Sequence, residues 1–133
     1  MVSQVKQLRC LIVDDNRDFI NAATKLLERE GIKVVGKASS SAEGLLCFEQ
    51  LRPDFALIDV DLGTESGFDL IDQLHNSGCA TPPPVILIST HSEQDFAEMI
   101  NASPAVGFLA KSALSSRAIH DLLLQDGNVE AGG

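Results

Sequence analysis

The sequence predicts an α/β fold in which helices cover both faces of a doubly wound, five-stranded parallel sheet. Five short apolar segments recur at intervals of roughly 20 to 30 residues, and apolar residues at helical spacing follow each one. The segment 55–58 is apolar without alternation, which is typical of a strand buried on both faces. Regular alternation of such strands with helices predicts βαβ units.

The first strand–helix pair is predicted from residue 8 to the glycine at position 31. Residues 8–13 form an apolar strand that ends at two aspartates, and Asn16 is suited to cap the helix that follows. Gly31 ends that helix, because glycine accepts the left-handed conformation after a last turn. The apolar positions of the helix are Phe19, Ala22, Ala23, Leu26 and Leu27.

The second pair leads to the central strand. A short strand over 32–35 precedes Ser40 and Glu43, whose spacing predicts a capping box. The helix that follows ends at Arg52-Pro53, because proline disfavours a helical residue before it. Its apolar positions are Ala42, Leu45, Leu46 and Phe48. The third strand then delivers Asp59.

The third helix is predicted over 67–75 and closed by Gly78. Its apolar positions are Phe68, Ile71 and Leu74. Pro82–Pro84 enforces an extended entry into the fourth strand, 85–88. Ser92, with Asp95 three residues later, caps a fourth helix whose apolar positions are Phe96, Met99 and Ile100.

The last pair consists of a strand over 106–109 and a helix over 115–124. The apolar positions of this helix are Ile119, Leu122 and Leu123. The polar, glycine-rich residues 125–133 are expected to form a flexible tail.

Composition indicates one soluble domain of 133 residues, with 44% apolar and 22% charged residues. No apolar run approaches the ~20 residues needed to cross a bilayer, and residues 1–4 lack the pattern of a secretory signal. Cys10, Cys47 and Cys79 lack metal-ligand spacing and are expected to be reduced thiols of a cytoplasmic protein.

The formal net charge of −9 argues against nucleic-acid binding by this domain, because such binding draws mainly on Lys and Arg. An acidic cation site is easier to reconcile with this charge. Part of the charge is expected to be a solvated surface.

Polar side chains stand just past four of the five predicted strands. Asp14 and Asp15 follow the first strand, Asp59 the third, Ser89 the fourth and Lys111 the fifth. Because the carboxyl ends of parallel strands lie at one edge of the sheet, we expect these side chains to meet around one crevice.

Three neighbouring carboxylates repel one another, and a divalent cation would remove the conflict. Oxygen ligands indicate Mg²⁺, with Mn²⁺ as the alternative ion. We expect Asp15 and Asp59 to be direct ligands and Asp14 to act through water. The backbone carbonyl of Asp61 is a candidate third protein ligand.

The remaining groups suit phosphoryl transfer. A carboxylate that attacks phosphorus needs no base, so Asp59 is predicted to attack a phosphodonor and form an aspartyl phosphate. Lys111 and the metal would neutralise developing charge, and Ser89 would hold one phosphoryl oxygen.

With these residues in place, the chain resembles the receiver domains of two-component response regulators. The matching segments are residues 11–15 (LIVDD), 56–59 (ALID), 85–89 (VILIS) and 107–111 (GFLAK). The resemblance covers residues 8–124, so that 1–7 would be an N-terminal extension and 125–133 the tail. It implies a flavodoxin-like fold with strand order 2-1-3-4-5.

The resemblance also implies partners and a switch. The donor would be a histidine kinase or a histidine phosphotransfer protein. Phosphorylation would turn Ser89 toward the phosphoryl group and move Phe108 inward. The surface of the fourth helix, fifth strand and fifth helix would then bind a downstream protein, an attached output domain or a second copy of the chain.

Three positions depart from the usual receiver pattern. Thr90 replaces a smaller residue and is predicted to narrow access to Asp59, which would slow small phosphodonors relative to a kinase. Ser112 replaces a proline, which disfavours a cis peptide after the lysine. Phe108 replaces the commoner tyrosine. His91 and Asp61 are further candidates for tuning the lifetime of the phosphoryl group.

Two other interpretations remain open from the sequence. Asp59 and Asp61, followed by Ser89 and Lys111, also match the order of groups in haloacid-dehalogenase-type phosphatases. Those enzymes carry further acidic ligands after the lysine, and no suitable pair follows Lys111 here. The other alternative is an interaction module that keeps the fold and works without phosphorylation.

Overall fold

The computed structural model describes residues 7–76 and 82–125. The strands are β1 (Arg9–Val13), β2 (Lys33–Ala38), β3 (Phe55–Asp59), β4 (Asp61–Leu62), β5 (Glu65–Ser66), β6 (Val85–Ser89) and β7 (Gly107–Ala110). The helices are α1 (Arg17–Arg29), α2 (Ser41–Leu51), α3 (Gly67–His75), α4 (Ala97–Ala102) and α5 (Ser116–Gln125). Two 3₁₀ turns, η1 (Glu93–Phe96) and η2 (Lys111–Ala113), precede α4 and α5.

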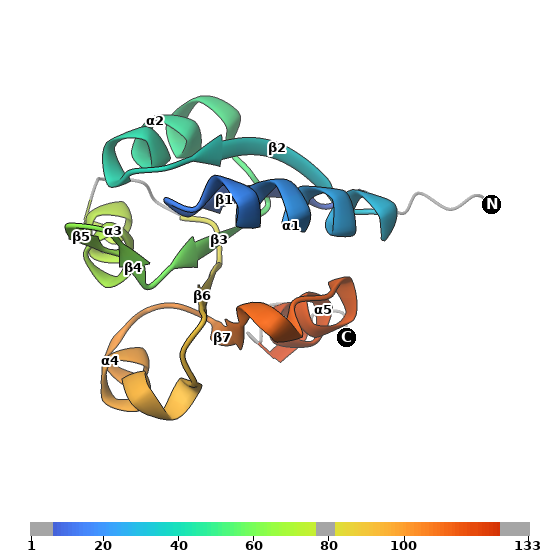
Figure 1. Cartoon of the computed structure of the whole chain (residues 1–133). Coiled ribbons are helices and arrows are strands. Elements are labelled where there is room, and N and C mark those ends of the chain that lie inside the picture. Colours follow the sequence, from blue (N-terminus) through green and yellow to red (C-terminus); the bar gives the residue numbers. More distant parts are fainter. Residues whose placement is uncertain (1–6, 77–81, 126–133) are drawn as a thin grey trace.

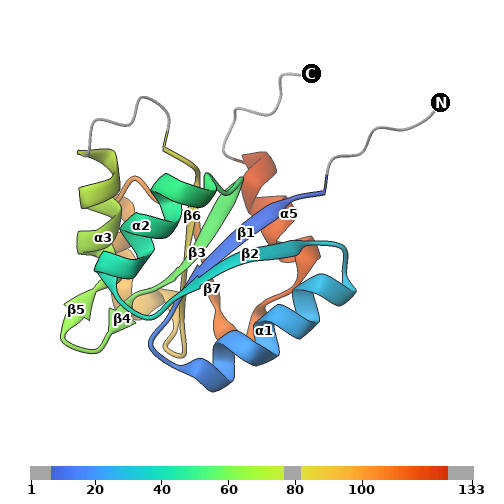
Figure 2. The same ribbon diagram turned by 90° about the horizontal axis from the view of Figure 1, so that it is seen from above.

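The five main strands form one parallel sheet in the order β2-β1-β3-β6-β7 (Figure 1). Counted without the short β4 and β5, this is the order 2-1-3-4-5. Helices lie on both faces, with α1 and α5 on one side and α2 and α3 on the other (Figure 2). The predicted fold class and strand order are therefore confirmed.

The sheet separates two apolar cores. On the α2–α3 side, Val13, Ile58 and Leu70 are among the buried residues. On the α1–α5 side, Leu27 and Ile119 pack against the opposite faces of the same strands. Because both faces of the central strands are buried, their polar residues can lie only at the strand ends, which is where the site is built.

The predicted helix starts are largely confirmed. The Asn16 side chain accepts a hydrogen bond from the Phe19 backbone N–H at 3.1 Å. Ser40 Oγ accepts from the Glu43 N–H, but the Glu43 carboxylate accepts from Ser39 rather than Ser40, so the predicted capping box is only half formed.

The remaining predicted helix boundaries agree to within one residue where the structure describes them, since α5 covers Ser116–Gln125 instead of 115–124. Gly31, with φ +95°, follows the end of α1. Helix α3 has the predicted bounds, whereas Gly78, expected to close it, lies outside the described residues.

Strand β2 is longer than predicted, because it runs to Ala38 instead of ending at residue 35. Its parallel pairing with β1 continues to the Val13–Ala38 pair. Gly36 lies inside the strand. A Cβ there would lie 2.6 Å from Leu51 Cδ1, so its lack of a side chain lets α2 pack closely. Pairing with β1 therefore extends the strand beyond the end predicted from its apolar residues.

Three predicted apolar helix faces are partly wrong, and among their positions Ala22 on α1 and Ala42 on α2 are exposed. Leu46 on α2 is 54% exposed and Met99 on α4 is 51% exposed. In α2, Gly44 faces the sheet, since a Cβ there would contact Leu70 and Val13 at 3.3 Å. The fourth helix begins as the 3₁₀ turn η1. The predicted cap of Ser92 and Asp95 is formed at its start, where the Asp95 carboxylate accepts a hydrogen bond from the Ser92 N–H.

The β4–β5 hairpin was not predicted from the sequence. It lies directly after β3, between the third predicted strand and the helix predicted over 67–75. Gly63 adopts φ +80°, a conformation that favours glycine, within this turn. The hairpin therefore gives a defined shape to the segment that follows Asp59.

Candidate functional site

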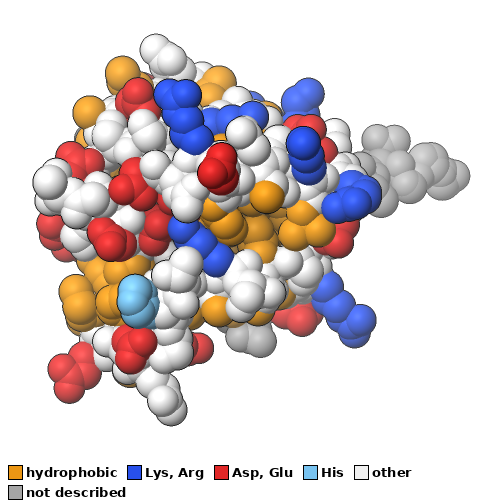
Figure 3. All heavy atoms as spheres, viewed as in Figure 1, with side chains coloured by type: hydrophobic (Ala, Val, Ile, Leu, Met, Phe, Trp, Pro, Cys, Tyr) orange, Lys and Arg blue, Asp and Glu red, His pale blue; other side chains and the backbone are white. Residues whose placement is uncertain are grey.

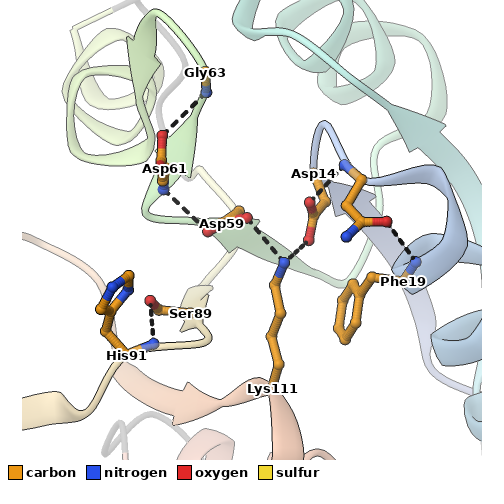
Figure 4. A network of polar contacts seen from close by, with 9 residues as sticks. Asp14, Phe19, Asp59, Asp61, Gly63, Ser89, His91 and Lys111 are labelled. Atoms are coloured by element: carbon orange, nitrogen blue, oxygen red, sulfur yellow. Dashed lines mark hydrogen bonds and ion pairs between the residues drawn. The ribbon is translucent and has the colours of Figure 1, made fainter.

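The ends of three strands meet at an ion-paired cluster of Asp14, Asp59 and Lys111 (Figure 4). The Lys111 ammonium lies 2.6 Å from Asp14 Oδ2 and 3.0 Å from Asp59 Oδ2. The Lys111 side chain is 11% exposed and the Asp14 side chain is fully buried. The prediction that the groups after β1, β3 and β7 converge is thus confirmed by geometry.

Asp14 is fixed by the turn between β1 and α1. Its Oδ1 accepts a hydrogen bond from the Asn16 N–H at 2.9 Å, and its own N–H donates to the Ala38 carbonyl at 2.9 Å. Its Oδ2 faces the Lys111 ammonium. A buried carboxylate needs such a partner, because an unpaired buried charge is costly.

Asp59 is held by the segment that follows it. Its Oδ1 accepts from the Asp61 N–H at 3.0 Å. Gly67 packs against its backbone, since a Cβ on Gly67 would overlap the Asp59 carbonyl oxygen. Burial raises the pKa of Asp59 to about 6; the Asp61 N–H and Lys111 oppose this rise, and the Asp14 charge adds to it.

Lys111 remains a cation in this site. Burial alone would lower its pKa, but the contacts with Asp14 and Asp59 outweigh burial and raise the pKa above its ordinary value. The ammonium also lies 4.4 Å from the centre of the Phe19 ring. The Lys111–Ser112 peptide is trans.

The carboxylates suit a divalent cation. One oxygen each of Asp14, Asp15 and Asp59 lies within 4.8 Å of the others. Three carboxylates beside one ammonium leave an excess of two negative charges, which is the charge a divalent cation would neutralise. Asp15 is exposed, and a Cβ on Gly63 would lie 3.3 Å from its Oδ2, so the hairpin borders the acidic cluster.

The face of the molecule seen in Figure 3 is polarised in the same sense. In Figure 3 acidic side chains gather over the end that carries α3 and the β4–β5 hairpin, whereas Lys and Arg lie mainly over the opposite end. Such a field raises the local concentration of cations near the acidic end.

The Ser89 hydroxyl at the end of β6 is hydrogen-bonded to the backbone of the loop that follows. Ser89 is buried, and its Oγ accepts from the His91 N–H at 2.9 Å. Thr90 and His91 are exposed. The His91 ring stands edge-on to Phe96, with centroids 6.0 Å apart. The loop therefore brings Ser89 to the site edge with its oxygen bonded to backbone.

Phe108 is already buried, with 8% of its surface exposed. Its ring centroid lies 6.4 Å from that of Phe96, which in turn lies 6.4 Å from Phe68. The Phe108 ring is thus already inside in this structure. Its inward movement upon phosphorylation stays a prediction.

Sequence reasoning missed three residues around the site. Phe19 has the spacing of an ordinary core position, which concealed its contact with Lys111. Gly67 is predicted as the first residue of a helix, but the pattern does not reveal that its lack of a side chain makes room for the Asp59 backbone. Glu65 accepts a hydrogen bond from the Ser41 N–H at 2.8 Å and so ties the hairpin to α2. The only sequence signal for any of the three is that a glycine, Gly67, stands at the first position of a predicted helix.

Residues 10–123 match the family model of the response regulator receiver domain. The chain belongs to this family. The solved signal receiver domain of the response regulator NarL from Mycobacterium tuberculosis has the same fold, with a TM-score of 0.78 at 24% identity over 92% of this chain and 98% of that one. A receiver domain serves as a phosphoacceptor, and this is the general function of the family.

Curated relatives place similar receiver domains in longer proteins. A protein-glutamate methylesterase/protein-glutamine glutaminase 2 of Koribacter versatilis is 32% identical over 78% of this chain and 29% of its own length. The transcriptional regulatory protein YvfU of Bacillus subtilis is 29% identical over 78% of this chain and 52% of its own. This receiver domain thus spans about a third to a half of the curated relatives it matches.

The described residues of the receiver domain include no helix with the length and apolarity to cross a membrane. Cys10 is buried and Cys47 is partly buried, and both are free thiols, whereas Cys79 lies outside the described residues. The predicted extension and tail also lie outside them, apart from residues 7 and 125.

Proposed function

We propose that Asp59 is the phosphoacceptor of this receiver domain and takes a phosphoryl group from the phosphohistidine of a histidine kinase or phosphotransfer protein. The observation that carries the proposal is the position of Lys111, whose ammonium lies 3.0 Å from Asp59 Oδ2 and 2.6 Å from Asp14 Oδ2. A nucleophilic carboxylate beside a fixed cation is what transfer of an anionic group requires.

In the transfer, a carboxylate oxygen of Asp59 forms a bond to phosphorus while the bond from phosphorus to the donor nitrogen breaks. The electron pair of that bond stays with the donor imidazole. The Asp61 N–H holds the acceptor carboxylate through Oδ1. Lys111 neutralises charge on the peripheral phosphoryl oxygens, and Ser89 binds one of them after releasing the His91 N–H.

Bound Mg²⁺, or Mn²⁺ in its place, would supply the positive charge that lets a phosphoryl group approach three carboxylates. Asp15 and Asp59 would hold the ion directly, Asp14 would hold it through water, and the Asp61 carbonyl would be the third protein ligand. The spacing of the three carboxylates supports one ion shared by Asp14, Asp15 and Asp59.

Phosphorylation is proposed to change the surface formed by α4, β7 and α5. Ser89 and Phe108 would be its switch residues, and Thr90, His91 and Asp61 would tune the lifetime of the phosphoryl group. The partners of this surface would be a downstream protein, an attached output domain or a second copy of the chain. The protein would act in the cytoplasm and would catalyse only its own phosphorylation and dephosphorylation.

The test is labelling with a small phosphodonor and Mg²⁺, followed by mass spectrometry of the intact protein. We expect one phosphoryl group per chain, lost in Asp59→Asn and after chelation of Mg²⁺. Asp72→Asn is the matched control, because it removes an exposed carboxylate from α3 and should leave labelling unchanged. Equal labelling of Asp59→Asn would refute the assignment, and repeated turnover of a phosphate ester would instead favour a phosphatase.

A further inference from the structure

We propose that Phe19 is a positioning residue for phosphoryl transfer, because its ring holds the Lys111 ammonium against the carboxylates. The inference rests on the proposed function of Asp59. It adds to the acidic site a group that the charge pattern of the sequence does not reveal.

The geometry surrounds the ammonium with groups of two kinds (Figure 4). Asp14 Oδ2 and Asp59 Oδ2 lie 2.6 Å and 3.0 Å from Lys111 Nζ. The Phe19 ring centre lies 4.4 Å from the same atom. This distance is within the range of cation–π attraction, which strengthens where water is excluded, and the Lys111 side chain is only 11% exposed.

The position of Phe19 is fixed by the same turn that fixes Asp14. Asp14 Oδ1 accepts from the Asn16 N–H at 2.9 Å, and Asn16 Oδ1 accepts from the Phe19 N–H at 3.1 Å. The ring is half-buried and packs against the core on the α1–α5 side. The turn therefore holds the ring face next to the buried carboxylate, and Lys111, which directly follows β7, reaches both.

The Phe19 ring orients the ammonium because it attracts the charge without offering an oxygen or nitrogen acceptor for its hydrogens. A lysine ammonium has three donors and a flexible stem, so in open water it would sample many positions. The Phe19 face attracts the charge but leaves the hydrogens of the ammonium to point at oxygen. The donors are thereby turned toward Asp14, Asp59 and the place where a phosphoryl oxygen arrives, which lowers the cost of ordering Lys111 during transfer.

The first test measures the initial rate at which acetyl phosphate labels the protein at saturating Mg²⁺. Phe19→Leu keeps an apolar side chain but removes the ring, and we expect the rate to fall about threefold to tenfold. Phe19→Tyr keeps the ring face and should stay within about twofold of the natural protein. Phe48→Leu is the control, because it removes a ring from the other core and should leave the rate unchanged.

The second test reads the contact without any phosphorylation. In the metal-free protein, the side-chain ε protons of Lys111 should show an upfield ring-current shift by NMR that is present with Phe19→Tyr and absent with Phe19→Leu. Phe19→Met replaces Phe19→Leu if the latter does not give a cooperative thermal transition.

Three outcomes separate the hypotheses. A natural rate in Phe19→Leu, or equal slowing in the Leu and Tyr variants, would overturn the positioning role while Asp59 labelling stands. Absence of the ring-current shift would overturn the contact itself. Failure of the natural protein to be labelled would refute the proposed function, and the NMR shift would still decide whether the ring holds the ammonium.

Discussion

Two groups of segments at the same sheet edge are held in opposite ways. The β1–β3–β7 side holds Asp14, Asp59 and Lys111 through buried ion pairs and backbone hydrogen bonds. The segment after β6, comprising η1 and α4, contains no buried residue and is held mainly by the half-buried Phe96 and Ile100. Segments with few buried apolar contacts open at low free-energy cost.

The difference suggests a division of labour. A phosphoryl-transfer site needs fixed groups, because misplaced charges lose most of their effect. A signalling surface needs a segment that can take two arrangements separated by little free energy. Ser89 lies at the border, since β6 holds its backbone while its Oγ bonds to the loop that leads to η1.

The largest effect is expected from Gly67→Ala on the fixed side. The new Cβ would overlap the Asp59 carbonyl oxygen and lie 3.0 Å from the Asp59 carbonyl carbon, so backbone must move. We expect the free energy of unfolding to fall by about 3 kcal/mol, with a loss of Asp59 labelling. Chemical denaturation and phosphodonor labelling measure the two effects.

Gly31→Ala is the matched control for that change. Gly31 has φ +95°, but nothing lies within 4 Å of its would-be Cβ, so the substitution adds backbone strain without a clash. It should cost about 1 kcal/mol and leave labelling intact. If both variants lost the same stability and kept the same labelling rate, the fixed character of the Asp59 segment would be refuted.

The next effect concerns how the stability of the metal-free protein depends on the charge of Asp59. Burial raises the pKa of Asp59 from 3.8 to about 6, so the metal-free folded state binds a proton more tightly than the unfolded chain. Its contribution to stability is present below pH 3.8 and is lost as the pH rises through about 6. We expect this loss to be on the order of 2 to 3 kcal/mol.

The measurement compares the natural protein with Asp59→Asn by denaturation between pH 4 and 7 in the presence of chelator. The stability difference between the two should grow in favour of the variant as the pH rises, and Mg²⁺ should reverse it. A difference that does not change with pH would show that Asp59 is not held under electrostatic strain.

A smaller global effect but a sharp local one is expected on the loosely held side. Phe96 is half-buried, so Phe96→Ala should cost about 1 kcal/mol, whereas Phe48→Ala, in the core, should cost about 3 kcal/mol. Amide hydrogen exchange in η1 and α4 should quicken in Phe96→Ala while β1 and β3 keep their protection. Equal acceleration throughout the sheet would contradict the division.

The comparison also explains what sequence could predict. Asp14, Asp59 and Lys111 were found because parallel strands place their carboxyl ends at one edge whatever the details of packing. The exposure of Met99 was not foreseen, because helical spacing alone does not say whether a partner covers the apolar face. Phe19 acts through a contact with Lys111, which is distant in the chain, and Gly67 acts through close packing against the Asp59 backbone. Helical and strand periodicity reveals neither contact.

The smallest effect is expected from Thr90→Ala, at the border between the two sides. Thr90 is exposed and follows Ser89, whose hydroxyl is bonded within the same loop. If the Thr90 side chain narrows the approach to Asp59, its removal should raise the rate of labelling by acetyl phosphate by a few-fold. Labelling by a larger phosphohistidine donor should change less, because that donor must displace the loop in either case. Thermal stability should stay the same, since an exposed methyl and hydroxyl contribute little to packing. An unchanged acetyl phosphate rate would show that access is set by the fixed side alone, and that the loop after β6 serves only the signalling surface.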